Sequence, residues 1–168
     1  MKKLQVIVAL GLVLQTAATV NASEYYKARN WYDHYARNIS SSTANILADY
    51  AFCRVQEIDC WLRMERKDIS SIESQIASEG HQLALKAKAE LSAKIGYYDF
   101  QRYDRSALEA MRSEGNRIAQ TKFDIEMLSS LFVQYKTGKR AAARMAKRDF
   151  FFECYKLLKN TSNTYRLW

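Results

Sequence analysis

The sequence contains no proline and only five glycines in 168 residues. Average usage is about 5% for proline and about 7% for glycine. Sandwiches and barrels need many turns, and turns are where these two residues concentrate. Their scarcity disfavours an all-β fold, and the missing proline excludes a proline-rich linker or a collagen-like chain.

The residues that usually build catalytic and metal sites are also scarce. The two histidines, His34 and His81, form neither a His-Glu-x-x-His motif nor zinc-ligand spacing with the cysteines. Glycine-rich phosphate loops, EF-hand loops and the Gly-x-Ser-x-Gly motif are absent. We therefore expect no cofactor, no metal ion and no enzymatic activity. One enzymatic alternative stays open, because two carboxylates suffice for a glycan hydrolase, and Glu79, Asp99 and Asp104 are unranked candidates.

The first 22 residues have the features of a secretory signal peptide. Lys2 and Lys3 precede an apolar run from Leu4 to Leu14, and Val20-Asn21-Ala22 offers the small or apolar residues that a signal peptidase needs. The run is too short to be a good membrane span. We expect cleavage near Ala22 and a periplasmic or secreted protein, since the Met-Lys-Lys start is typical of bacteria.

The expected mature chain is one domain of residues 23–168. Loss of the two lysines lowers its formal charge from +8 to +6. A domain of this size buries about two-thirds of its unfolded surface, and a hydrophobic content of 48% is too high for a disordered chain. No later apolar run approaches the roughly 20 residues of a spanning helix.

Hydrophobic periodicity predicts an all-α fold, an up-and-down bundle of about four main helices with disulfide support. The segments are residues 24–66, weakest at 38–43, where a division into two pieces is the alternative, then 68–95, 106–138 and 139–159. The first carries the stripe Leu47, Ala51, Val55, Ile58 and Leu62, and the second carries Ile69, Ile72, Ile76, Gly80, Leu83, Ala87, Leu91 and Ile95. We expect segments two and three to form an antiparallel hairpin, with the first and last packed across it.

Two glycines lie inside the predicted helices on their apolar stripes. Gly80 and Gly115 each cost about 1 kcal/mol of helix propensity relative to alanine. We expect both to allow a close approach by a neighbouring helix, rather than to serve a ligand.

Three cysteines in an exported protein leave at least one unpaired within the chain. Cys53 and Cys60 are seven residues apart, which is about 10.5 Å along an unbroken helix and too far for a disulfide. Either the helix breaks near residues 56–59, or Cys154 pairs with one of the two. We favour the second arrangement, because Cys53 and Cys60 share a helical face.

The clearest charge feature is a basic run on the last segment, without an acidic residue. Its members on one predicted face are Lys136, Arg140, Arg144 and Lys147, with Arg148 beside them. A solvated surface would explain such a run, but it also suits docking to an acidic partner. Phe150-Phe151-Phe152 follows, and three consecutive aromatic residues cannot all face one core.

Aromatic residues also crowd the expected hairpin loop. Tyr97, Tyr98, Phe100 and Tyr103 fall within seven residues. Tyrosine anchors protein interfaces well, although the same residues can simply cap a core.

These features favour a non-enzymatic binding module of inhibitor or immunity type. The expected partner is another protein of the cell envelope, an acidic one being an option, and it would contact the basic helix and the aromatic loop. One alternative is an accessory subunit of a secretion or conjugation assembly, and another is the small glycan hydrolase. Export disfavours binding to intracellular nucleic acid despite the basic charge.

Overall fold

The computed structural model describes residues 22–66, 68–97, 102–129 and 136–164. The predicted signal peptide therefore lies almost wholly outside the described residues. Within the described ranges every regular element is helical, which confirms the predicted helical bundle. The elements are α2 (Ala22–Trp31), a π-helical turn η1 (Tyr32–Ala36), α3 (Ser41–Met64), α4 (Ser71–Tyr97), α5 (Arg102–Ser129) and α6 (Lys136–Thr164).

The first predicted segment is divided where its side chains compete for backbone hydrogen bonds. The turn η1 ends at Ala36, and α3 begins after Ser40, whose hydroxyl accepts a hydrogen bond from the backbone N–H of Thr43 at 3.1 Å. At the end of α2, the indole of Trp31 donates to the backbone carbonyl of Ala107 on α5 at 3.0 Å. The first bond caps α3, and the second holds the N-terminal helix against the bundle.

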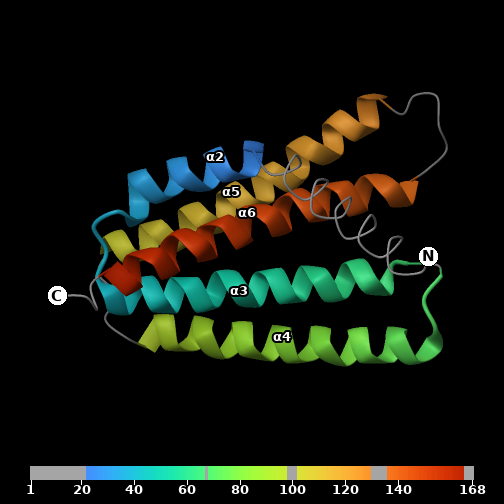
Figure 1. The fold of residues 1–168 in the computed structure, drawn as a ribbon, viewed down its shortest axis with the longest axis horizontal. Coiled ribbons are helices and arrows are strands. Elements are labelled where there is room, and N and C mark those ends of the chain that lie inside the picture. Colours follow the sequence, from blue (N-terminus) through green and yellow to red (C-terminus); the bar gives the residue numbers. More distant parts are fainter. Residues whose placement is uncertain (1–21, 67, 98–101, 130–135, 165–168) are drawn as a thin grey trace, which may run out of the picture.

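Helices α3 and α6 form the centre of the molecule (Figure 1). Helix α4 lies against α3, on the side away from α6, while α5 and α2 pack against α6. Neighbouring long helices run in opposite directions, as an up-and-down bundle requires. The predicted hairpin of segments two and three is wrong in its packing, because α4 contacts α3 and α5 contacts α6.

The main core joins α3, α5 and α6. Four of the five stripe residues predicted on α3 are buried or nearly so, and Leu62 is half-buried. Phe150 and Phe151 are also buried, whereas Phe152 is half-buried and stacks on Tyr155. A Cβ atom on Gly115 of α5 would lie 2.9 Å from the Phe151 ring, so this glycine does permit a close approach.

Helix α4 departs from the prediction in the face that it buries. Its small residues Ala77 and Ala84 are buried, while Ile72, Ile76 and Leu83 of the predicted stripe are exposed. A Cβ atom on Gly80 would lie 3.0 Å from the Sγ atom of Cys60 on α3. The helix therefore lies close to α3 at these small residues, while these three large side chains of the predicted stripe stay outside.

The predicted disulfide support is wrong, since all three cysteines are free thiols. Helix α3 is unbroken between Cys53 and Cys60, so their separation along it excludes a bond. Cys60 faces Gly80 of α4, whereas Cys154 is completely buried in the main core. Burial raises the pKa of the Cys154 thiol well above its usual value. The last helix therefore does not dock beside Cys60 in the way that the shared face suggested.

Candidate functional site

Two arginines of the basic run point toward α3 and are neutralised there. Arg144 forms an ion pair with Glu65 and lies over the ring of Trp61, 5.0 Å from its centroid. Arg148 donates to Asp59 at 2.8 Å and to Asp149 on its own helix at 2.9 Å. These contacts fasten α6 to the C-terminal half of α3, so both arginines have a structural role.

The other members of the run do not share that direction. Lys147 donates to Asn116 of α5 at 2.6 Å. Burial lowers the pKa of Lys147 to about 8, and the positive charges of Arg54 and Lys88 add to this effect. Arg140 is exposed, and the side chain of Lys136 lies outside the described part of the chain. The basic run therefore divides between two packed interfaces and solvent.

The aromatic cluster falls largely outside the described residues. Tyr98 and Phe100 belong to the undescribed connection between α4 and α5. Tyr97 ends α4 and Tyr103 lies in the first turn of α5, but their side chains are not described. The binding role that the sequence suggests for this aromatic cluster therefore stays a prediction.

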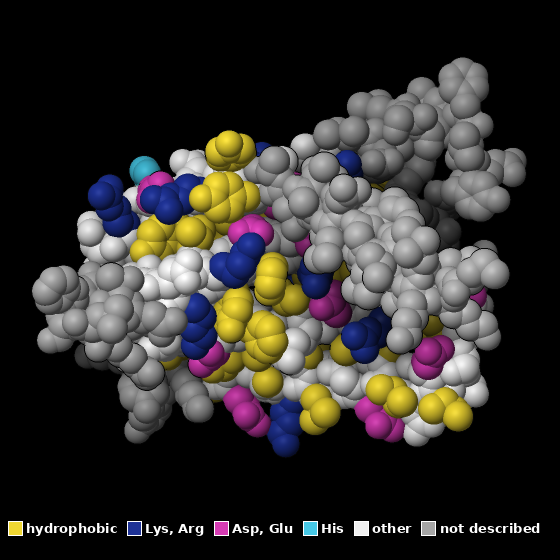
Figure 2. All heavy atoms as spheres, in the orientation of Figure 1, with side chains coloured by type: hydrophobic (Ala, Val, Ile, Leu, Met, Phe, Trp, Pro, Cys, Tyr) yellow, Lys and Arg dark blue, Asp and Glu magenta, His cyan; other side chains and the backbone are white. Residues whose placement is uncertain are grey.

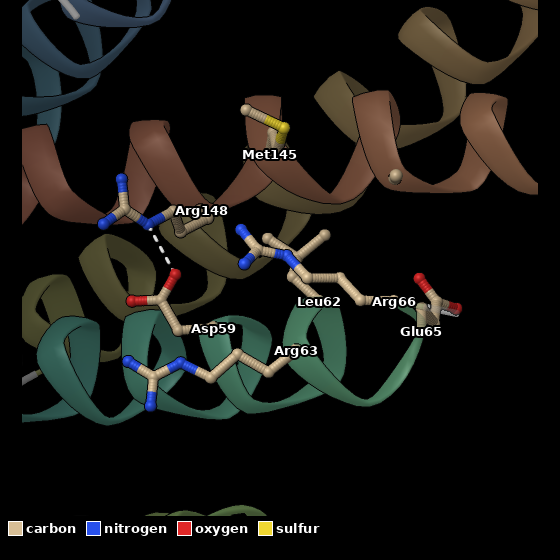
Figure 3. Close-up of a pocket in the computed structure, with 8 residues that line it drawn as sticks. Asp59, Leu62, Arg63, Glu65, Arg66, Met145 and Arg148 are labelled. Carbon is tan, nitrogen blue, oxygen red and sulfur yellow. Dashed lines mark hydrogen bonds and ion pairs between the residues drawn. The ribbon is translucent and has the colours of Figure 1, made fainter. Parts of the chain in front are cut away.

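A groove between the C-terminal half of α3 and α6 has a volume of about 590 Å³. Figure 3 shows Arg66 extending back along α3 over Leu62, on the side that faces α6, and Arg63 reaching along α3 near Asp59. Its lining residues are Asp59, Leu62, Arg63, Glu65, Arg66, Met145 and Arg148, with Ala141 at one end.

The groove has an excess of positive charge. Both of its carboxylates are occupied, because Asp59 binds Arg148 and Glu65 binds Arg144. Within the described ranges neither Arg63 nor Arg66 has a carboxylate partner. A free guanidinium group binds a carboxylate through two parallel hydrogen bonds.

Sequence reasoning missed Arg63 and Arg66. Both are close to the C-terminal end of α3, where a positive charge interacts favourably with the helix dipole whether or not it binds a ligand. A signal was present, because the tripeptide Arg66-Lys67-Asp68 interrupts the apolar pattern after Arg63. This charged tripeptide alone does not distinguish a binding site from an ordinary helix end.

The candidate acid–base residues that the structure describes do not form a common site. Glu79 is exposed and accepts a hydrogen bond from Gln75 on its own helix at 3.0 Å. Asp104 is buried and accepts from Thr43 of α3 at 3.2 Å, and Asp99 lies outside the described residues. His34 is exposed on η1, while His81 is buried against Trp61 with 5.0 Å between ring centroids. These observations give the glycan hydrolase no support.

The described residues offer neither a metal site nor a membrane span. They contain no group of three or more His, Cys, Asp or Glu side chains that could hold a metal ion. None of their helices combines the length and apolar character needed to cross a bilayer. Comparison of the chain with models of protein families, with characterised proteins and with solved structures finds no significant match.

Proposed function

We propose that the protein is an exported, non-enzymatic binding module that captures an acidic segment of another envelope protein. The proposal rests on one observation, the arginine-rich groove between α3 and α6. Arg63 and Arg66 line it without carboxylate partners among the described residues. Our more specific hypothesis is that this binding module is an inhibitor or an immunity protein.

The walls of the groove suit a peptide better than a simple ion. Met145 is exposed and Leu62 is half-buried, so apolar surface lies beside the guanidinium groups. Methionine adapts to differently shaped partners because its side chain is flexible and polarisable. A segment that alternates acidic and apolar residues would match both features.

The structure separates the arginines that hold the helices together from those that, among the described residues, are free to bind a partner, and only the second kind tests the role of the groove. Reversal of Arg144 or Arg148 would break the ion pairs that hold α6 to α3, so lost binding would be uninformative. Arg63→Glu with Arg66→Glu removes the free charges and leaves these pairs in place. The matched control is Arg37→Glu with Arg105→Glu, two exposed arginines that lie directly after η1 and in the first turn of α5, away from the C-terminal half of α3.

The test is crosslinking of intact cells followed by binding measurements with the purified partner. We expect one stoichiometric envelope protein to be captured by the wild type and the control, but not by the Arg63/Arg66 variant. Its isolated acidic segment should bind with an affinity that falls as salt rises. Equal capture by all three proteins would refute the role of the groove.

A further inference from the structure

A second, smaller pocket collects positive charge from four different helices. It has a volume of about 280 Å³ and is lined by Arg54 of α3, Lys88 of α4 and Arg112 of α5, together with Tyr50, Ser92 and Asn116. Lys147 of α6 reaches the same region, because it donates to Asn116 at 2.6 Å. The proposed partner groove shares none of these residues.

The acids nearby do not balance these cations. Glu57 is buried and receives both Arg54 and Lys88, the latter at 3.0 Å. Glu109 binds Arg112 at 2.8 Å from an exposed position. Two carboxylates therefore face four basic groups that are all half-buried. Like charges held together away from water are costly unless a counter-charge accompanies them.

The excess of positive charge acts on Lys147. Besides burial, the charges of Arg54 and Lys88 lower its pKa to about 8, and Glu57 only partly opposes them. An anion placed among these groups would reverse the sign of the local field. It would favour the charged form of Lys147 and so raise the pKa of this residue.

The two arginines that line the pocket are also held in place by neighbouring side chains. Arg112 is held in place by hydrogen bonds from its Nε atom to the hydroxyl of Tyr50 at 2.9 Å and from a terminal nitrogen to Ser92 at 3.4 Å. Arg54 is held over the ring of Phe151, 5.5 Å from its centroid. Preorganised guanidinium groups lose little freedom on binding and recognise tetrahedral oxyanions well.

We propose that this pocket binds a small free oxyanion with two negative charges, of the phosphate or sulfate class, between α3, α4, α5 and α6. A bound dianion would compensate the excess of positive charge. It would also bridge α4 and α5, which make few contacts with each other in the described part of the chain. The site is distinct from the groove of the proposed function and does not depend on it.

The test is titration of the purified protein with inorganic phosphate at constant ionic strength. We expect saturable heat in calorimetry and a rise in thermal stability that chloride does not reproduce, since a ligand that binds only the folded state stabilises it. Arg112→Gln and Lys88→Gln should each weaken binding about tenfold, as expected for loss of one charge-assisted contact. Arg117→Gln is the control, because Arg117 is exposed on α5 and its ion-pair partner among the described residues is Glu114.

A second measurement keeps the test valid if a variant is unstable. The side-chain resonances of Lys147 in the wild type should titrate at a higher pH when phosphate is present. Absence of saturable binding, or equal binding by Arg112→Gln and wild type, would overturn the proposal. Binding only to vesicles of an anionic phospholipid, and not to inorganic phosphate, would also overturn it, because the phosphate would then be recognised as part of a lipid surface.

Discussion

The two sides of helix α3 are packed in opposite ways. Toward α6, large side chains such as Leu47, Phe150 and Phe151 fill a continuous core, and two arginine–carboxylate pairs join the helices. Toward α4, the buried residues are the small Ala77 and Ala84, together with His81, which contacts Trp61. No α4 residue in the described ranges belongs to the main cluster. An apolar stripe therefore does not guarantee that its large side chains form the interface.

The largest expected effect contrasts one large residue from each region. Phe151→Ala should lower the free energy of unfolding by about 3–5 kcal/mol, because it empties a filled core position. Leu83→Ala should change it by no more than about 0.5 kcal/mol, because this side chain is exposed. Urea unfolding followed by circular dichroism measures both. A loss of several kcal/mol for Leu83→Ala would show that the α4 stripe is buried after all.

The two interfacial glycines sharpen the same contrast. Gly115→Ala should lower the free energy of unfolding by about 1–3 kcal/mol, because its Cβ atom would meet the buried ring of Phe151 at 2.9 Å. Gly80→Ala should be close to neutral, because Cys60 is half-buried and its sulfur can move by the small amount needed. The gain of about 1 kcal/mol in helix propensity then offsets this adjustment. Equal losses in urea unfolding would mean that both interfaces are equally rigid.

The smallest effect concerns lysines beside the two interfaces. Lys147→Met should raise the free energy of unfolding by about 1 kcal/mol near neutral pH, after allowance for solvent screening. The unfolded chain binds more protons than the folded one between the lowered pKa of about 8 and the ordinary value of 10.5. Wild-type stability should therefore rise with pH across this window, and the rise should vanish in Lys147→Met.

The control for this measurement is Lys88→Met on α4. Lys88 is also half-buried, but it binds Glu57 at 3.0 Å, so loss of this ion pair should offset the relief of its repulsion with Lys147, and removing it should not stabilise the protein. Denaturant unfolding in phosphate-free buffer from neutral to alkaline pH compares the two variants. An identical pH profile for wild type and Lys147→Met would contradict the assignment.

Periodicity correctly predicted the helices and the buried stripe of α3, because a helix between two neighbours needs apolar residues around much of its surface. It was wrong for α4, where spacing shows which residues share a face but not which face meets a neighbour. The basic run illustrates a second limit. Its carboxylate partners Asp59 and Glu65 are 89 and 79 residues away in the sequence, so neither local charge nor spacing could show that Arg144 and Arg148 are neutralised.

The candidate sites were hidden for a related reason. Arg54, Lys88, Arg112 and Lys147 each look like an ordinary surface charge on a separate helix, and only the packing of four helices brings them together. Arg63 and Arg66 line a groove because α6 supplies its opposite wall. Sites made by convergence depend on tertiary structure, and a single sequence does not encode them as a local pattern.

The free thiols give the bundle two internal reporters of its own opening. Only a thiolate reacts quickly with an alkylating reagent, and burial suppresses this form most strongly at Cys154. Cys60 faces α4, so partial separation of α4 from α3 uncovers it, whereas Cys154 becomes accessible only when the main core opens. The labelling rates of the two sulfurs therefore separate local detachment of one helix from global unfolding within the same molecule.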